Sequence, residues 1–430
     1  MPASSHVLDP IRVTFDDDRA VADAGLLLTG TLVGRLGLET TIDEKVTRGY
    51  RPGRKMLTIV STLLAGGDCI DDVDLLHAGA TSQVVGHDTV AASTVGTWLR
   101  SLTFGHVRQL DAVTEAALAR AWQAGAGPGD AAMFVDVDST ICEVHGDAKQ
   151  GAAYGYTRQL GLHPLVATRA ETGEILHGRM RKGSAGSGRG AQRFVRETIG
   201  RVRRAGASGT LIFRMDAGFW SRKVIKACVD HEAAFSITVA RQPVITNAID
   251  AIDEDAWVDI AYTDGGTAQV AETVWDNWRL IVRRTRIEDD PNLPALFAGW
   301  RHHAFVTNRE GDPVSLDRDH RAHAVVELSI RDLKHGAGLN HCPSGIFNAN
   351  AAWLLAATLA HNLMRWTQLL GAPHTPRLAN AKTFRRRLLT IPGRLTRSAR
   401  RWTLHLPSRW PWQHVFEDTL GRLRALPAPM

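Results

Sequence analysis

The sequence predicts a mixed α/β core with a β-rich insertion, flanked by a helical N-terminal region and a basic helical C-terminal region. Strand-like and helical segments alternate between residues 132 and 240, which is typical of a sheet with helices packed on it. Strand-like runs then dominate residues 241–319. Two long helical segments and a run of basic residues complete the 430-residue chain.

The N-terminal region, residues 1–128, is predicted to be helical. Its helical stretches, rich in small and aliphatic residues, are 20–38, 55–65 and 91–102. A short helix and a turn precede the last stretch, which carries Trp98 and Arg100. This arrangement resembles a helix-turn-helix, although an ordinary helical bundle fits the residues equally well. The breaker cluster 125–129 (GAGPG) marks the end of the region.

The core is predicted to combine residues 129–240 with residues 320–372, because short apolar runs bounded by turn residues favour strands and wider apolar spacing favours helices. The expected core strands are 132–137, the strand–turn–strand segment 163–176, 210–215 and 234–240. The expected core helices are 192–204, 221–233, 321–335 and 348–370. The insertion, 241–319, has expected strands at 268–275, 278–286 and 304–307, and the basic C-terminal region is 373–430.

The composition excludes several classes of protein. Hydrophobic residues make up 44% and charged residues 22%, as in ordinary globular proteins. No apolar run approaches the roughly 20 residues of a membrane span, and no signal peptide is apparent. The four cysteines lie far apart, which disfavours a disulfide framework or a cysteine zinc site. We therefore expect a cytoplasmic protein without a membrane partner.

The charge is distributed unevenly along the chain. The net charge is only +6, but residues 333–416 contain twelve Lys or Arg and no Asp or Glu, while the rest of the chain carries 39 basic and 45 acidic residues. Such a segment, which includes Arg385, Arg386 and Arg387, points to a polyanionic partner, with nucleic acid the leading candidate. A solvated basic tail is the alternative.

Three acidic residues stand where a catalytic site is expected. Asp138 and Asp216 each follow an apolar strand-like run, and Glu327 lies within a predicted helix. Carboxylates are hard oxygen ligands for Mg²⁺ or Mn²⁺, and a pair of such ions can act on phosphodiesters. Each residue alone has an ordinary explanation, as a turn, a cap or a solvated helix face. Their combination, with strands and helices between them, is more specific.

Several segments together resemble the DDE transposases of bacterial insertion sequences. The resemblance is to the insertion-sequence-thirteen-eighty family, within the insertion-sequence-four clan, and it runs from about residue 10 to residue 420. It is carried by VDVDSTICEVHG (135–146), GAAYGYTRQLGLHPLVATRAETGEILHGRMRKG (151–183), FRMDAGFW (213–220), ELSIRDLKHG (327–336) and FNANAAWLLAATLAHNLMRW (347–366). The resemblance implies a ribonuclease-H-like catalytic core.

The resemblance also implies an activity. Asp138, Asp216 and Glu327 would be the catalytic residues and would hold two Mg²⁺ or Mn²⁺ ions in each active site. The reaction would be cleavage at the terminal inverted repeats, followed by strand transfer into target DNA. The N-terminal region would read the repeat, two copies would form a synaptic homodimer, and the protein would associate with the bacterial nucleoid. A metal-dependent nuclease without strand transfer, or an inactive DNA-binding derivative, remains the alternative.

The clan signature, Tyr-x2-Arg-x3-Glu-x6-Lys, is only partly present. Glu327 and Lys334 fit it, whereas His320 and His323 stand at the Tyr and Arg positions. Arg321 is near enough to substitute for the absent Arg in contacting DNA phosphate. Lys334 and Arg331 share a helix face with Glu327, and both are expected to contact DNA. An ion pair between Glu327 and Arg331 is the alternative.

Asp136 lies two residues before Asp138, so both point to the same face of a strand and either could be the first ligand. Asp138 is favoured because Ser139 and Thr140 follow it, as in the clan; Asp136 would then support the ligand from behind. Two tryptophans of the insertion, Trp275 and Trp278, are candidates for stacking on a flipped base. A role in the core is the commoner use of such residues.

One further segment, the glycine-rich run 183–190 (GSAGSGRG), lacks the Lys-Ser or Lys-Thr ending of a nucleotide-binding loop. It is expected to be a flexible connection to the following helix.

Overall fold

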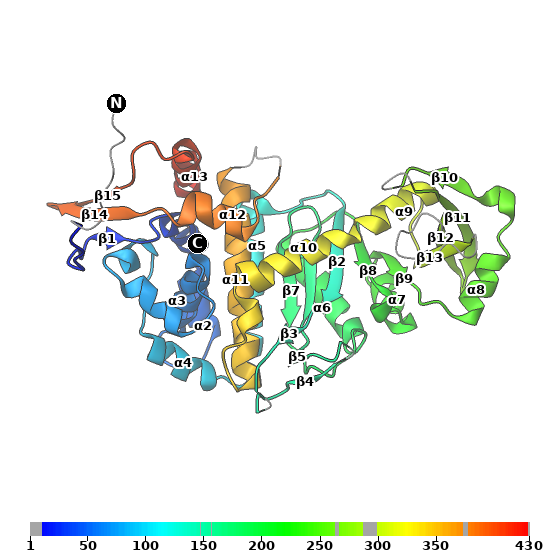
Figure 1. The fold of residues 1–430 in the computed structure, drawn as a ribbon, viewed down its shortest axis with the longest axis horizontal. Helices are drawn as coiled ribbons and strands as arrows, with labels where there is room; N and C mark the ends of the chain where they lie inside the picture. The colour runs from blue at the N-terminus through cyan, green and yellow to red at the C-terminus, as the bar shows by residue number, and fades with distance from the viewer. Residues whose placement is uncertain are drawn as a thin grey trace.

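A mixed sheet runs through the centre of the molecule. The computed structural model describes residues 11–146, 148–155, 157–262, 266–286, 299–372 and 377–428. Within these ranges nine strands form one sheet, in the order β10-β11-β12-β13-β9-β8-β2-β6-β7. The molecule is elongated (Figure 1), with a helical region at one end, the insertion at the other, and the core of the sheet between them.

The core part of the sheet has five strands in the order β7-β6-β2-β8-β9. They are β2 (Met133–Ser139), β6 (Leu165–Arg169), β7 (Ile175–Arg179), β8 (Leu211–Met215) and β9 (Ala234–Thr238). The first three pair antiparallel, and β2, β8 and β9 pair parallel. The core is thus a mixed α/β sheet, as predicted. Helices α6 (Ala191–Ala205) and α7 (Arg222–Val229) form the crossovers, close to their predicted positions.

The insertion continues the core sheet. Its strands are β10 (Val258–Ile260), β11 (Ala268–Trp275), β12 (Trp278–Arg286) and β13 (Trp300–Thr307), next to helix α8 (Pro243–Asp250). Strand β13 pairs antiparallel with β9, which joins the two parts. The bounds of β11 and β12 agree with the prediction because the two-residue turn between them, Asp276–Asn277, has positive φ at both positions, as tight hairpins require.

The predicted helix 321–335 is not continuous. Helix α9 (Pro313–Arg321) is followed by a 3₁₀ turn, by α10 (Val325–Arg331) and by a π-helical turn at Asp332–Gly336. The wider turn buries Leu333 while Asp332 accepts hydrogen bonds from Arg365 and from the backbone of Ala381. These partners lie far along the chain, so the local sequence could not show the break.

Helix α11 (Phe347–Gly371) lies between the helical region and the sheet (Figure 1). It is buried on all sides and packs against α3, α5, α13 and β7. The N-terminal helices are α1 (Leu26–Arg35), α2 (Leu38–Lys45), α3 (Pro52–Ala65), α4 (Ala92–Arg100) and α5 (Phe104–Ala121). A small sheet, β3 (Cys142–Glu143), β5 (Leu160–Leu162) and β4 (Ala153–Tyr154), follows β2. No helix of the described residues is long and apolar enough to cross a membrane.

The C-terminal region is helical only in part, which corrects the prediction. After α12 (Ala381–Phe384) and a π-helical turn, β14 (Gly393–Ser398) and β15 (Arg401–His405) form a hairpin, and α13 (Gln413–Ala425) follows. Strand β14 also pairs with β1 (Ala20–Val21) near the start of the chain. The Thr and Trp residues of this hairpin favour strands. The prediction overlooked this preference because the arginines of the segment were interpreted only as a basic run.

Candidate active site

The first two carboxylates lie at the same edge of the sheet. Parallel pairing of β2 with β8 aligns Val137 with Met215, so Asp138 and Asp216 occupy the next positions on neighbouring strands. Asp138 is partly buried, and Asp216 is exposed at the start of a 3₁₀ turn. The Asp216 Oδ1 atom accepts a hydrogen bond from the Gly218 N–H at 2.9 Å. Carboxyl ends of parallel strands are where sites form in such sheets.

The third carboxylate comes from α10, which packs against β2 and β6. Glu327 is exposed, and it lines a recess of about 230 Å³ together with Asp138. The full lining is Asp138, Ser139, Thr140, Glu327, Ile330, Arg331, Lys334 and His335. The structure thus brings residues 189 positions apart in the sequence to one recess, with Asp216 beside it directly after β8.

The electrostatics of the recess are those of crowded negative charge. Burial is the main cause that raises the pKa of Asp138 to about 6; the hydrogen bond from the Ser139 N–H opposes it, the charges of Asp216 and Glu327 add to it, and His323 opposes it. Among the described residues, no Lys or Arg forms an ion pair with any of these three carboxylates. Uncompensated carboxylate oxygens suit a hard divalent cation, so the residues fit the metal that the resemblance implies.

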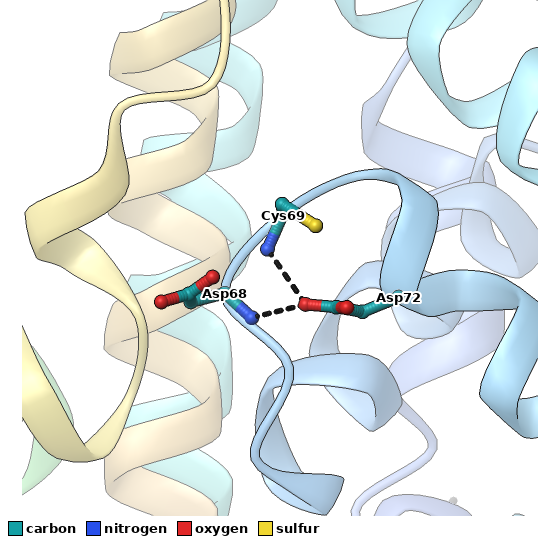
Figure 2. Close-up of side chains that lie close together, drawn as sticks. All are labelled: Asp68, Cys69 and Asp72. Atoms are coloured by element: carbon teal, nitrogen blue, oxygen red, sulfur yellow. Dashed lines mark hydrogen bonds between the residues drawn. The ribbon is translucent and has the colours of Figure 1, made fainter.

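A tighter acidic cluster lies elsewhere. Figure 2 shows Asp68, Cys69 and Asp72, whose ligand atoms lie within 4.8 Å of one another, closer than those of any other such trio in the described residues. The Asp72 Oδ2 atom accepts hydrogen bonds from the backbone N–H groups of Asp68 (2.8 Å) and Cys69 (3.1 Å). These hydrogen bonds stabilise the loop that follows α3, and this structural role accounts for the proximity of the three side chains. The three catalytic candidates are spread more openly around their recess.

Asp136 is fully buried and engaged. It receives two hydrogen bonds from Arg214, at 2.6 and 2.8 Å, and its Oδ1 lies 3.0 Å from His323 Nδ1. Asp138 has no such basic partner, so the geometry favours Asp138 over Asp136 as the first ligand. The sequence analysis did not single out Arg214. A signal was present, because Arg214 lies two residues before Asp216 just as Asp136 lies two residues before Asp138. The register of β2 with β8 then places Asp136 beside Arg214.

The two histidines of the signature have different environments. His320 is buried between the hydroxyls of Ser236 (2.7 Å) and Thr238 (2.9 Å) and stacks on Phe305. Burial holds its pKa well below the ordinary value, so this ring is neutral. His323 instead bonds to Asp136 behind the recess and is close enough to Asp138 to lower the pKa of that carboxyl.

Arg321 is not at the recess. Its Nε atom donates to Asp317 at 2.9 Å, and the same carboxylate pairs with Arg283 of β12. The guanidinium therefore fastens α9 to the insertion, and we withdraw it as a phosphate contact. The sequence could not show this arrangement, because Arg283, which shares the Asp317 carboxylate with Arg321, is distant in sequence.

Two other predicted DNA contacts, Lys334 of the signature and Arg331 on the same helix face, line the recess. Lys334 is partly buried and its Nζ donates to the Ile141 carbonyl at 2.8 Å. Arg331 is exposed, and within the described residues it forms no ion pair with Glu327. The alternative prediction, an ion pair between these two residues, is therefore wrong. Both side chains remain available to a phosphate at the recess.

The tryptophans of the insertion are half-buried at the β11–β12 turn. The Trp275 ring contacts Trp220 edge-on, with centroids 5.3 Å apart, and Trp278 contacts Phe235 at 5.1 Å. Trp220 lies four residues after Asp216, so the turn is packed beside the segment that carries the second carboxylate.

The basic C-terminal run divides into two kinds of residue. Arg385 is partly buried and donates to the carbonyls of Leu63, Leu64 and Gly336, which closes the end of α3. Burial lowers its pKa. Arg385 is therefore a structural residue rather than the DNA contact we expected. Arg386 and Arg387 are exposed, as a DNA contact requires.

The glycine-rich segment 183–190 is hydrogen-bonded to a buried arginine. Arg181 donates to the carbonyls of Gly186 (2.9 Å), Ser187 (3.2 Å) and Arg189 (2.9 Å). The Ser187 hydroxyl lies 2.9 Å from that of Ser139, next to Asp138. The loop is thus held against the recess, and the buried Arg181 that holds it could not be recognised from the glycine pattern.

Comparison with known proteins identifies the family. No curated protein matches this chain. Among solved structures, the chain is similar to piggyBac transposase in a cryo-EM structure of its synaptic complex with hairpin DNA, with 12% identity, a TM-score of 0.47, and coverage of 86% of this chain and 80% of that one. A family model, transposase DDE domain group 1, matches residues 4–428. The chain therefore belongs to the transposase DDE domain group 1 family.

Proposed function

We propose that this protein is a cut-and-paste transposase of the insertion-sequence-thirteen-eighty family, which cleaves DNA at the terminal inverted repeats of its element and joins the freed 3′-hydroxyl to target DNA. Family membership supports a transposase. The observation that carries the site assignment is the recess itself, where Asp138 and Glu327 meet beside Asp216, and where burial and these acidic neighbours raise the pKa of Asp138.

The proposed roles follow from the positions of the side chains. Asp138, Asp216 and Glu327 would hold two Mg²⁺ or Mn²⁺ ions, which when bound supply charge neutralisation for the attacking and leaving oxygens. Lys334 and Arg331 would hold the scissile phosphate group at the recess. The Asp136–Arg214–His323 group would keep the end of β2 in place behind the ligand.

The rest of the chain would position the DNA. The N-terminal helical region would read the terminal repeat, while Arg386 and Arg387 would contact the backbone. Trp275 and Trp278 are the candidates for stacking on a flipped base, although their aromatic partners already hold both rings. Cleavage of two ends in one complex requires a synaptic homodimer, formed in the bacterial nucleoid.

Cleavage of labelled DNA from the ends of the element tests this proposal. We expect Mg²⁺-dependent nicking by the wild type and a loss of about 10³-fold or more in Asp138→Ala, Asp216→Ala and Glu327→Ala. Asp230→Ala, an exposed carboxylate on the same sheet domain, is the matched control and should cleave normally. Full activity in Asp138→Ala would overturn the assignment of the first ligand.

A second assay separates the transposase from a simple nuclease. A pre-cut end with a 3′-hydroxyl should be joined to a plasmid in the presence of Mg²⁺. Cleavage without any joining would favour the nuclease of the same fold, and binding without either reaction would favour an inactive derivative.

A further inference from the structure

The β14–β15 hairpin projects from the molecule at the end opposite the insertion (Figure 1). Only its base is packed: Leu395 is 7% exposed and pairs across the hairpin with Leu404. Beyond this pair every residue from Arg397 to Thr403 is exposed. The hairpin is therefore a two-stranded ribbon with a solvated tip.

The tip carries positive charge without compensation. Arg397, Arg400 and Arg401 lie at or beside the turn, and none forms an ion pair with an acidic residue of the described chain. Arg394, at the base, does pair with Asp17 at 3.4 Å between the charged atoms. Three arginines that lie close to one another without acidic partners repel each other, so they do not stabilise the fold. The same charges would attract an anion.

An exposed aromatic ring accompanies these charges. Trp402 is 53% exposed, whereas the other tryptophans of the chain are at least partly buried. It stands opposite Arg397 in the ribbon, whose guanidinium lies 5.2 Å from the ring centroid. A flat, exposed ring beside a cation is suited to the deoxyribose surface of a nucleic acid, which offers apolar groups between the phosphates.

We propose that the β14–β15 ribbon is a second DNA-binding surface, which enters a groove of the duplex at the element's own end, away from the cleavage recess. A two-stranded ribbon fits the major groove of double-stranded DNA, and arginines on both sides of it reach the phosphates. This inference rests on the proposed function for the identity of the DNA.

The position of the ribbon selects end DNA over target DNA. Strand β14 pairs with β1, so the ribbon is fastened to the start of the N-terminal region that is proposed to read the repeat. The helices of that region and α11 separate it from the sheet edge that carries Asp138 (Figure 1). A duplex held by the ribbon and the N-terminal region together would be the one whose end lies in the recess.

The test uses the full-length protein and double-stranded DNA segments tiled across the sequence that flanks its gene. The triple variant Arg397→Ala/Arg400→Ala/Arg401→Ala should bind the preferred segment at least about ten-fold more weakly and lower the slope of log affinity against log salt by about 2 to 3. Trp402→Ala should weaken binding about five-fold with an unchanged salt slope, because the contact of an uncharged ring with the sugars releases no counterions.

The matched control removes the same charge elsewhere. Arg204, Lys223 and Lys226 are exposed on α6 and α7, and the variant with alanine at all three should bind DNA within about two-fold of wild type. Thermal unfolding of each variant checks that folding is intact. Equal binding by the ribbon variant and this control would overturn the proposal.

Two other outcomes would also overturn it. Normal binding of end DNA with a loss only in plasmid capture would assign the ribbon to target DNA. A loss of dimer in sedimentation with unchanged binding would make it a subunit contact. Failure of the proposed function is separate, because it would appear as absent cleavage in the wild type while the effect of the ribbon on binding persists.

Discussion

Asp138 bears a charge that the metal-free protein is poorly able to hold. Its pKa is raised from the ordinary 3.8 to about 6, so the folded protein binds this proton more tightly than the unfolded chain does. The resulting stabilisation is complete below the unfolded pKa and is lost as the pH rises through about 6. A divalent cation would supply the missing positive charge.

The variant Asp138→Asn, which cannot ionise, should therefore be more stable than the wild type at neutral pH in EDTA, by up to about 3 kcal/mol. The difference should shrink as the pH falls below about 6, and urea unfolding at several pH values measures it. Mg²⁺ should stabilise the wild type and leave the variant nearly unchanged. Parallel stability curves for the two proteins would contradict the assignment of Asp138 to a crowded acidic site.

Arg214 is the residue on which the end of β2 depends. Its side chain is 3% exposed, and it donates to both oxygens of Asp136 and to the Asp319 carbonyl at 2.5 Å. We expect Arg214→Met to cost about 3–5 kcal/mol, because it removes the guanidinium that neutralises the fully buried Asp136 carboxylate and leaves that carboxylate with the weaker contact to His323. Urea unfolding gives the free energy. Arg222→Met, which breaks an exposed pair with Asp276, should change it by less than about 1 kcal/mol.

The sequence indicated three carboxylates as candidate ligands but did not show how the residues that pack behind them pair with one another. Asp138, Asp216 and Glu327 could be proposed from the sequence because two of them follow strand-like runs and the third lies in a helical segment that resembles a family motif. Arg214 and His323 meet Asp136 only through the register of β2 with β8 and the approach of the helical segment. A pairing of that kind depends on tertiary structure and leaves no local pattern.

At the scale of elements, Glu174 joins three segments of the chain. This carboxylate is fully buried in the β6–β7 hairpin and accepts hydrogen bonds from the indole N–H groups of Trp122 (3.0 Å) and Trp366 (2.6 Å). Trp122 follows α5 and Trp366 belongs to α11. Glu174 also pairs with Arg169 at 3.2 Å, which balances its charge. The hairpin is thereby fixed to both helices.

Glu174→Ala should destabilise the fold by about 3–5 kcal/mol, since it leaves two indole donors and a guanidinium without their acceptor. Glu174→Gln, which keeps one carbonyl oxygen, should cost less. Equilibrium unfolding in urea measures both, with the exposed Glu417→Ala as the control. A cost below about 1 kcal/mol for Glu174→Ala would show that the helices dock without this carboxylate.

Elements with strong local signals were predicted well, and those shaped by distant partners were not. The strands β11 and β12 alternate and have a clear turn, so their bounds followed from the sequence. The π-helical turn at Asp332–Gly336 depends on Arg365 and Ala381, and the glycine-rich loop depends on Arg181. The C-terminal hairpin was missed because its arginines were interpreted only as charge.

At the scale of the molecule, the continuous sheet links the insertion to the catalytic core. Strand β12 contributes to two apolar clusters: Leu280 and Val282 lie in the main core, whereas Ile281 on the opposite face packs with Val270 and Phe305 in a smaller cluster of the insertion. The two faces share one backbone, which hydrogen-bonds through β13 to β9. Loss of either cluster should therefore weaken the same sheet.

Ile281→Ala and Leu280→Ala test whether the insertion and the core unfold together. Each removes a fully buried aliphatic side chain from β12, at a cost of about 2–5 kcal/mol. If the sheet is one cooperative unit, both variants should lower the protection of amide hydrogens in β2 and β8 as much as in β11, as measured by hydrogen exchange with mass spectrometry. Faster exchange confined to the insertion in Ile281→Ala, with β2 unaffected, would show that the insertion opens alone. Cooperative unfolding would mean that a DNA contact at the β11–β12 turn is transmitted to the carboxylates through a rigid sheet rather than across a hinge.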